Sequence, residues 1–265
     1  MWPEFLSTNL GLAYVAANNY AVCGATAADV LNQVAGFPAP SKPNLSLYFL
    51  WAGDSDFLRA FPPDDFSGSY LNVTNEVAWT QLIQTIISRN SNAVNRLYTK
   101  GARTIVTENL HDFSRLPGAL LAFGTNSVGL SKLSEYMARF NEGFIAAMNA
   151  YSQTRPELRI LSVDVFSKFN DVLANSAQYG FTKTTVDALG DALLTNKSFS
   201  GPGADYAFWD GLHVTSKLNA LFAAWHLEVL TNSVLEKLDM TITGGSPNIQ
   251  MTRLLIGRDY IYIAE

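Results

Sequence analysis

The chain of 265 residues contains a single cysteine, Cys23, which excludes an intrachain disulfide and any metal site built from several cysteines. It has no run of about 18 apolar residues, so we expect no transmembrane segment. Its 18 Lys and Arg residues are scattered among 23 Asp and Glu residues, which argues against nucleic acid as a partner. Residues 1–4 also lack the basic-then-apolar pattern of a signal peptide.

What is present is a globular composition, 48% hydrophobic and 15% charged, enough for one large domain. Apolar residues at both parities predict a doubly buried strand over residues 45–51. Further strands are expected over residues 20–22, 103–107 and 159–165, and helices over 2–12, 27–34, 76–100, 130–153, 166–175 and 215–230. This alternation predicts an α/β fold, a flavodoxin-like three-layer α/β/α parallel sheet of about five strands.

The pattern changes after residue 232. Residues 239–243, 248–255 and 260–263 look like short strands separated by turns rich in glycine, which is typical of an antiparallel meander. We therefore expect a main domain over residues 1–232 and the start of a separate β-module, or a C-terminal extension, over residues 233–265.

Asp210 and His213 form the first candidate for chemistry. A histidine oriented by a carboxylate is the base of a serine hydrolase, because the acid selects the tautomer and stabilises the imidazolium. The alternatives are an exposed loop aspartate beside a helix-entry histidine, or a pair of metal ligands. No further histidine or cysteine lies nearby, and neither His111 nor His226 has ligand spacing around it, so we expect no metal.

Two glycine-containing segments follow predicted strands. Gly24 could present its N–H to a developing oxyanion, or could simply be required for the turn. Gly53, Ser55 and Asp56 belong to a segment that should border a site at the carboxyl ends of the strands, or form a solvated acidic turn.

Three segments together resemble motifs of the SGNH/GDSL hydrolases, in particular the phospholipase, lecithinase and haemolysin-like lipolytic branch. Residues 19–26 (NYAVCGAT) resemble the family's N-[YF]-A-V-G-G-A-x, residues 50–58 (LWAGDSDFL) resemble W-x-G-x-N-D-[FY]-L, and residues 208–213 (FWDGLH) resemble F-W-D-x-x-H. The resemblance covers residues 2–230 and implies hydrolysis of a small-molecule or lipid ester, with no cofactor. It also implies a secreted or envelope-associated parent protein.

The resemblance assigns the general base to His213, the orienting acid to Asp210 and an oxyanion donor to the N–H of Gly24. Ser55 falls where the family has an asparagine whose amide is a second oxyanion donor. Loss of one such donor typically lowers the rate by a factor of about 10² to 10³. Val214 replaces the family's usual proline.

The family's nucleophile lies in a motif, F-G-D-S-L-S-D, that has no match here. Gly53, Asp54 and Ser55 spell part of it, but the remaining motifs then fall out of register, so we do not assign the nucleophile to Ser55. We expect the chain to be inactive by itself. The alternatives are a partial reading frame of an active enzyme and a non-catalytic descendant that binds lipid or glycan.

The same interpretation predicts a defect in the sheet. In a doubly wound order 2-1-3-4-5, the family's first strand lies between those expected here at residues 20–22 and 47–51. Without that strand, buried backbone groups would lack partners. We expect a gap there, a distorted direct pairing, or a replacement strand from the C-terminal tail, and a marginally stable chain.

Overall fold

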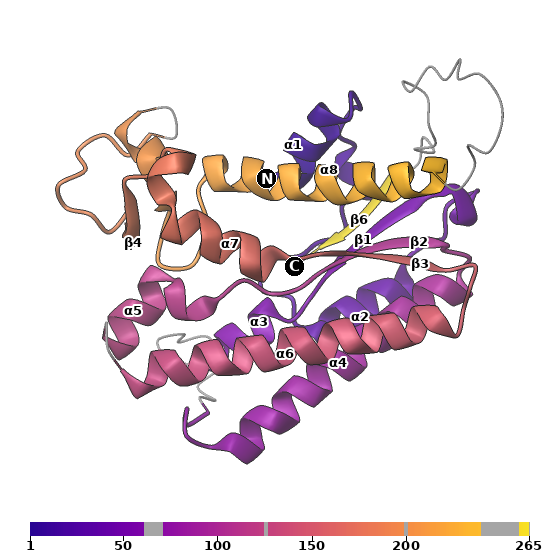
Figure 1. Ribbon diagram of the computed structural model, residues 1–265, viewed down its shortest axis with the longest axis horizontal. Helices are drawn as coiled ribbons and strands as arrows, with labels where there is room; N and C mark the ends of the chain where they lie inside the picture. Colours follow the sequence, from indigo (N-terminus) through magenta and orange to yellow (C-terminus); the bar gives the residue numbers. More distant parts are fainter. Residues whose placement is uncertain (61–70, 125–126, 199–200, 240–259, 265) are drawn as a thin grey trace.

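A computed structural model describes residues 1–60, 71–124, 127–198, 201–239 and 260–264, with only the backbone of 234–239 and 260–264. The main sheet has four parallel strands in the order β3-β2-β1-β6 (Figure 1). They are β1 (Leu47–Trp51), β2 (Thr104–Glu108), β3 (Arg159–Val163) and β6 (Tyr260–Ala264). Parallel strands place their carboxyl ends at one edge of the sheet, where the candidate residues are expected.

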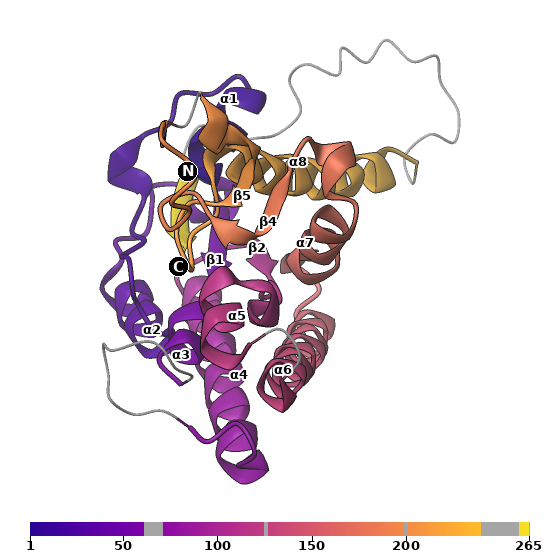
Figure 2. The same cartoon turned by 90° about the vertical axis from the view of Figure 1, so that its left-hand side faces the viewer.

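Helices cover both faces of the sheet, which confirms the predicted three-layer fold (Figures 1 and 2). On one side α1 (Trp2–Asn9) packs against α8 (Ser216–Asp239), and on the other α2 (Ala27–Gly36), α4 (Glu76–Thr99) and α6 (Val128–Gln153) pack in sequence. The short α3 (Asp54–Leu58) follows β1, and α7 (Val165–Ala174) follows β3. Among these described helices, none combines the length and hydrophobicity needed to cross a bilayer.

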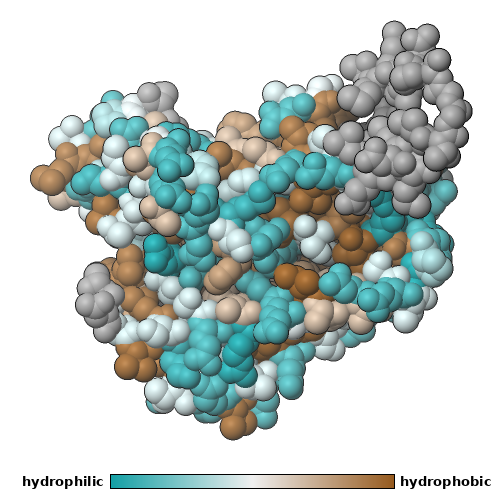
Figure 3. All heavy atoms as spheres, in the orientation of Figure 1, coloured by the Kyte–Doolittle hydropathy of each residue, from teal (hydrophilic) through white to brown (hydrophobic). Residues whose placement is uncertain are grey.

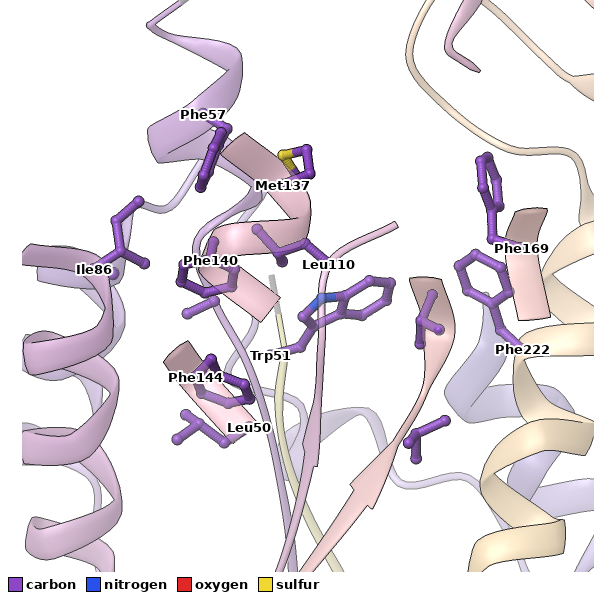
Figure 4. Packing of buried hydrophobic residues seen from close by; sticks show 14 of the residues in the cluster. Leu50, Trp51, Phe57, Ile86, Leu110, Met137, Phe140, Phe144, Phe169 and Phe222 are labelled. Atoms are coloured by element: carbon purple, nitrogen blue, oxygen red, sulfur yellow. The ribbon is translucent and has the colours of Figure 1, made fainter. Parts of the chain in front are cut away.

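The predicted double burial of β1 is confirmed. Leu50 is fully buried and lies on the side of Phe140 and Phe144 (Figure 4). The neighbouring Trp51 points to the opposite side, where its ring centroid lies 5.8 Å from that of Phe222 in α8. A strand between two helical layers can use apolar side chains at both parities, which explains the continuous apolar run in its sequence.

Local signals in the sequence account for several helix ends. Thr26 caps α2, as expected, in a reciprocal capping box with Asp29: the Asp29 N–H donates to Thr26 Oγ1, and the Thr26 N–H donates to Asp29 Oδ2. Gly101 follows the end of α4 with a φ of 98°, a conformation that favours glycine. The third helix begins one residue after Gly53, so the expected acidic loop is in fact a helical turn.

The strand predicted at residues 20–22 is absent. Asn19 Oδ1 accepts a hydrogen bond from the Ala21 N–H at 3.0 Å, and Asn19 Nδ2 donates to the Tyr14 hydroxyl at 2.9 Å. The Ala21 N–H is thereby satisfied by a side chain within its own segment and is not available to a neighbouring strand. The apolar residues at 20–22 therefore pack from an irregular segment.

A second sheet pairs β4 (Lys183–Asp187) with β5 (Tyr206–Phe208) in parallel. Neither strand was predicted: β4 is mostly polar and β5 has three residues, so both lack a readable period. This small sheet lies beside the short helix α5 (Pro117–Phe123), as Figure 2 shows. Because β5 leads directly to Asp210, the second sheet carries the base of the candidate site.

The strand β6 pairs in parallel with β1 along the edge opposite β2, from Leu47↔Tyr260 to Trp51↔Ala264. It also contacts the 3₁₀ helix η1 (Ala16–Asn18). A strand from the tail thus pairs with β1. That it replaces a missing first strand of the family stays a prediction. The other two predicted tail strands lie outside the described residues, and a domain boundary at residue 232 stays a prediction.

At the opposite end of the sheet, β3 forms the edge within the described strands, and only its last residue is fully buried. Helices α8 and α6 contact β3 from opposite faces. Hydrophobic residues show between those two helices in the space-filling view (Figure 3). The two helices therefore cover the β3 edge only in part, which agrees with the intermediate burial of Ile160 and Leu161.

Candidate active site

Asp210 and His213 meet in the turn between β5 and α8. The Asp210 carboxylate lies 2.8 and 3.0 Å from Nδ1 of the His213 ring, so the expected contact is present. Asp210 Oδ1 also accepts the N–H groups of Leu212 at 2.9 Å and His213 at 2.7 Å. The side chain of Asp210 is 36% exposed and that of His213 is 63% exposed, so the pair is open to a substrate.

The environment keeps Asp210 ionised. Partial burial opposes its charge, but the two backbone N–H groups and the His213 ring outweigh that cost and lower the pKa of Asp210 below its usual value. An ionised carboxylate facing Nδ1 favours the tautomer that carries its hydrogen there. Nε2 accepts and donates no hydrogen bond among the residues described, so its lone pair is available to take a proton.

The turn is closed mainly by local bonds. The Trp209 N–H donates to the His213 carbonyl at 2.7 Å, and Phe208 forms an antiparallel bridge with Val214. The Thr215 N–H donates to Ala207 O at 2.9 Å, which joins the start of α8 to β5. Sequence spacing could predict the meeting of Asp210 and His213 because they are only three residues apart.

Gly24 lies in an exposed turn before α2 with a φ of 76°, which favours glycine. Its carbonyl accepts a hydrogen bond from Arg59 Nη2 at 2.9 Å. Its N–H has no acceptor in the part of the chain that the structure describes. Gly24 therefore adopts the positive φ that the turn requires, and its backbone N–H is available as a hydrogen-bond donor.

Ser55 lies half-buried in the first turn of α3. Gly53, just before it, has a φ of 130°, and a Cβ at that position would lie 3.0 Å from Ile86 Cγ2 and 3.3 Å from Leu110 Cδ1. Both the backbone conformation and the close packing therefore require glycine at residue 53. The resulting sharp turn sets the position of Ser55 at the carboxyl end of β1.

Asp56 joins the two glycine-containing segments. It is 7% exposed, and its Oδ2 accepts the Ala27 N–H at the start of α2 at 2.6 Å, while Arg89 Nη1 lies 3.5 Å from Oδ1. Burial raises the pKa of Asp56, although the Ala27 N–H and Arg89 oppose that rise. Its carboxylate is therefore engaged with α2 and holds the Gly24 and Ser55 segments together.

The site residues thus form two halves. Gly24 and Ser55 lie in segments joined through Asp56 and Arg59, whereas Asp210 and His213 lie in the turn that follows β5 of the second sheet. Within the described ranges, no hydrogen bond or ring contact joins one half to the other directly. Residues 109–118, which follow β2, contact both halves: Phe113 packs against Phe57 of α3, and Gly118 bonds to Gly211 in the Asp210–His213 turn.

The other two histidines lie in the core. His111 is surrounded by Trp51, Phe113 and Phe169, and burial lowers its pKa to about 3. His226 Nε2 lies 2.8 Å from Glu108 Oε1, with both side chains fully buried. No group of three or more histidine, cysteine or acidic residues arranged for a metal ion occurs in the described parts.

Sequence reasoning missed two residues that organise residues 109–118. The Asn141 side chain brackets Leu110, accepting its N–H and donating to its carbonyl, both at 2.8 Å. The Gly118 N–H donates to the Gly211 carbonyl, inside the Asp210–His213 turn, at 2.8 Å. A glycine directly after a proline at a helix start was the only local sign of the second contact.

Comparison with known proteins gives a consistent family. The model of the family described as GDSL-like Lipase/Acylhydrolase matches residues 1–226. GDSL esterase/lipase At1g71691 from Arabidopsis thaliana is 25% identical over 185 residues, which cover 67% of this chain and 47% of that protein. GDSL esterase/lipase APG from the same plant is 28% identical over 190 residues, which cover 67% and 52%. The chain spans about half the length of the curated relatives it matches.

Proposed function

We propose that this chain, which belongs to the GDSL-like lipase/acylhydrolase family, carries the base and acid of a serine ester hydrolase. The observation that carries the proposal is the Asp210 carboxylate at 2.8 Å from His213 Nδ1 in an exposed turn, with Nε2 left available. A histidine held in this way is the general base that activates a serine hydroxyl.

The reaction needs a serine at Nε2 of His213. Its hydroxyl oxygen attacks the ester carbonyl carbon while His213 takes the hydroxyl proton, and Asp210 stabilises the imidazolium. The carbonyl oxygen gains negative charge, which the open N–H of Gly24 and the hydroxyl of Ser55 would stabilise by hydrogen bonds. His213 then returns the proton to the leaving alcohol, and water releases the acyl group by the same steps.

We further propose that residues 1–265 alone do not complete this reaction. In the described part of the chain no serine hydroxyl contacts His213, and Ser55 belongs to the other half of the site. Assayed with p-nitrophenyl acyl esters, the chain should show no turnover that depends on His213. A fluorophosphonate probe, which labels activated serines, should leave every peptide unmodified.

A matched variant makes this test decisive. In it, a strand and turn bearing the family's Gly-Asp-Ser-Leu motif precede residue 1. Turnover should then appear, should disappear in His213→Ala, and should fall by about 10⁴ in Asp210→Asn. If the unmodified chain instead hydrolyses the ester and Ser55→Ala abolishes this with an unchanged circular dichroism spectrum, Ser55 is the nucleophile and our assignment is wrong.

One observation favours a second function, binding of lipid or glycan without catalysis. Ser55 replaces the asparagine of the family motif, and a hydroxyl is a shorter and less preorganised donor than an amide. If the motif-bearing variant folds but gains no turnover, this alternative is supported. For the catalytic function we propose a small-molecule or lipid carboxylic ester as substrate, and a secreted or envelope-associated parent protein.

A further inference from the structure

The contact between Gly118 and Gly211 brings two backbones unusually close together. Gly118 is buried in the first turn of α5, and its N–H donates to Gly211 O at 2.8 Å. A Cβ on Gly118 would lie only 2.9 Å from that carbonyl oxygen. A Cβ on Gly211 would lie 3.5 Å from Gly118 Cα, an ordinary van der Waals distance. The contact therefore requires glycine at residue 118 but not at residue 211.

This contact reaches the tip of the catalytic turn. Gly211 lies between Asp210 and His213, and the other hydrogen bonds to residues 210–213 come from the turn itself or from Trp209. Among the described residues, the Gly118 N–H is the one hydrogen-bond donor from elsewhere in the fold that holds residues 210–213. The orientation of the His213 ring relative to the rest of the molecule thus depends on α5.

The segment before α5 is anchored to α6. Asp112 Oδ1 accepts the Ser114 N–H and hydroxyl at 3.0 and 2.6 Å, and Asp112 Oδ2 accepts the Ser134 hydroxyl of α6 at 2.9 Å. Together with Asn141, which brackets Leu110, these bonds attach residues 110–114 to one rigid helix. Groups held by several buried hydrogen bonds keep a single geometry.

The same segment also touches the other half of the site. The Phe113 ring lies edge-on to the Phe57 ring of α3, with centroids 6.3 Å apart. Phe57 is fully buried two residues after Ser55, so this ring contact packs Phe113 directly against α3. Residues 110–118 therefore form a strut, with Phe113 against the Ser55 half and Gly118 against the His213 half.

We propose that Gly118 is a positioning residue for His213, and that residues 110–118 set the placement of His213 relative to Gly24 and Ser55. This inference rests on the proposed function for its catalytic meaning, but the positioning itself can be measured without turnover. A methyl group at residue 118 displaces the Gly211 carbonyl, opens the turn and loosens the contact between Asp210 and the ring of His213.

The test is ¹⁵N NMR of the His213 ring in residues 1–265. In spectra recorded at alkaline pH, where imidazole is neutral, the two ring nitrogens of the unmodified protein should give separate shifts, those of a ring with hydrogen on Nδ1. Gly118→Ala should move the two shifts toward each other as the tautomers mix. Gly211→Ala should leave them unchanged. Gly143→Ala is the matched control, because its added Cβ in α6 would meet only the flexible end of Ile87 at 2.8 Å.

Gly118→Ala with wild-type ring shifts would overturn the proposal. So would equal changes in all three variants, since they would indicate general loosening of the fold. If Gly118→Ala does not melt cooperatively, Phe113→Leu decides: it relaxes the contact with Phe57 and should shift the His213 ring signals in the same direction by a smaller amount. Unchanged signals in Phe113→Leu would then contradict the role of the strut.

Discussion

The fold contains two histidine–carboxylate pairs with the same closest N···O distance, one exposed to solvent and one buried. Asp210 and His213 are three residues apart, exposed and held by one turn, with a closest contact of 2.8 Å. Glu108 and His226 are 118 residues apart in sequence numbering, also 2.8 Å apart, and fully buried between β2 and α8. The same contact distance therefore occurs in an exposed pair and in a buried pair, and the surroundings decide what each pair can do.

Burial makes the second pair structural. His226 stacks on Trp2, with ring centroids 4.0 Å apart, and its Nδ1 lies 2.7 Å from the Phe222 carbonyl. The Glu108 contact has ion-pair distance without the alignment of a well-formed hydrogen bond. Neither side chain can reach a substrate, so the pair serves to dock α1 and α8 on the sheet.

The largest effect should come from breaking the buried pair. Glu108→Leu leaves Nε2 of His226 buried without a polar partner and should lower the free energy of unfolding by about 1–3 kcal/mol. Urea denaturation followed by circular dichroism measures this loss. A loss below about 1 kcal/mol would show that the pair contributes nothing beyond packing.

A double replacement sharpens the same point. Glu108→Leu with His226→Phe removes both polar groups and keeps an aromatic ring against Trp2. Replacing a buried pair by apolar residues is often neutral or stabilising, so most of the stability lost in Glu108→Leu should return. Failure of the double variant to recover would indicate that the polar pair itself is required.

Removing the histidine of the exposed pair should change stability very little. His213→Ala should change the free energy of unfolding by no more than about 0.5 kcal/mol, because the residue is exposed and its partner stays solvated. The same denaturation experiment measures it. A loss of several kcal/mol would mean that this pair, too, is mainly structural.

The smallest effect concerns acid. The pKa of Asp210 is lower in the folded state than its usual value of about 3.9, so the group stabilises the fold above that pH. This stabilisation is lost as pH falls through the lowered pKa. Asp210→Asn should therefore lose less stability than the unmodified protein does as the pH falls below about 4, as measured by urea denaturation. A steeper loss in the variant would contradict the lowered pKa.

Local patterns predicted much of the fold. The apolar run of β1, the capping box at Thr26 and the helix stop at Gly101 each depend on neighbours within a few residues, and the structure has all three. The strand expected at residues 20–22 is absent, and the Ala21 N–H donates to the side chain of Asn19 instead of to a neighbouring strand. The second sheet was not predicted because β4 and β5 are too short to show a strand pattern, and each is identified as a strand only by its pairing with the other.

For the candidate site, the short spacing of Asp210 and His213 predicts their contact, and the three motifs predict the family, whereas for Gly24 the sequence left a turn and an oxyanion donor as alternatives. The contacts of Asp56 with α2, of His226 with Glu108 and of Gly118 with Gly211 are visible only in the folded chain. The partners in these three contacts are 29, 118 and 93 residues apart in sequence numbering. Their meeting depends on the packing of the whole sheet and its helices, which no local pattern encodes.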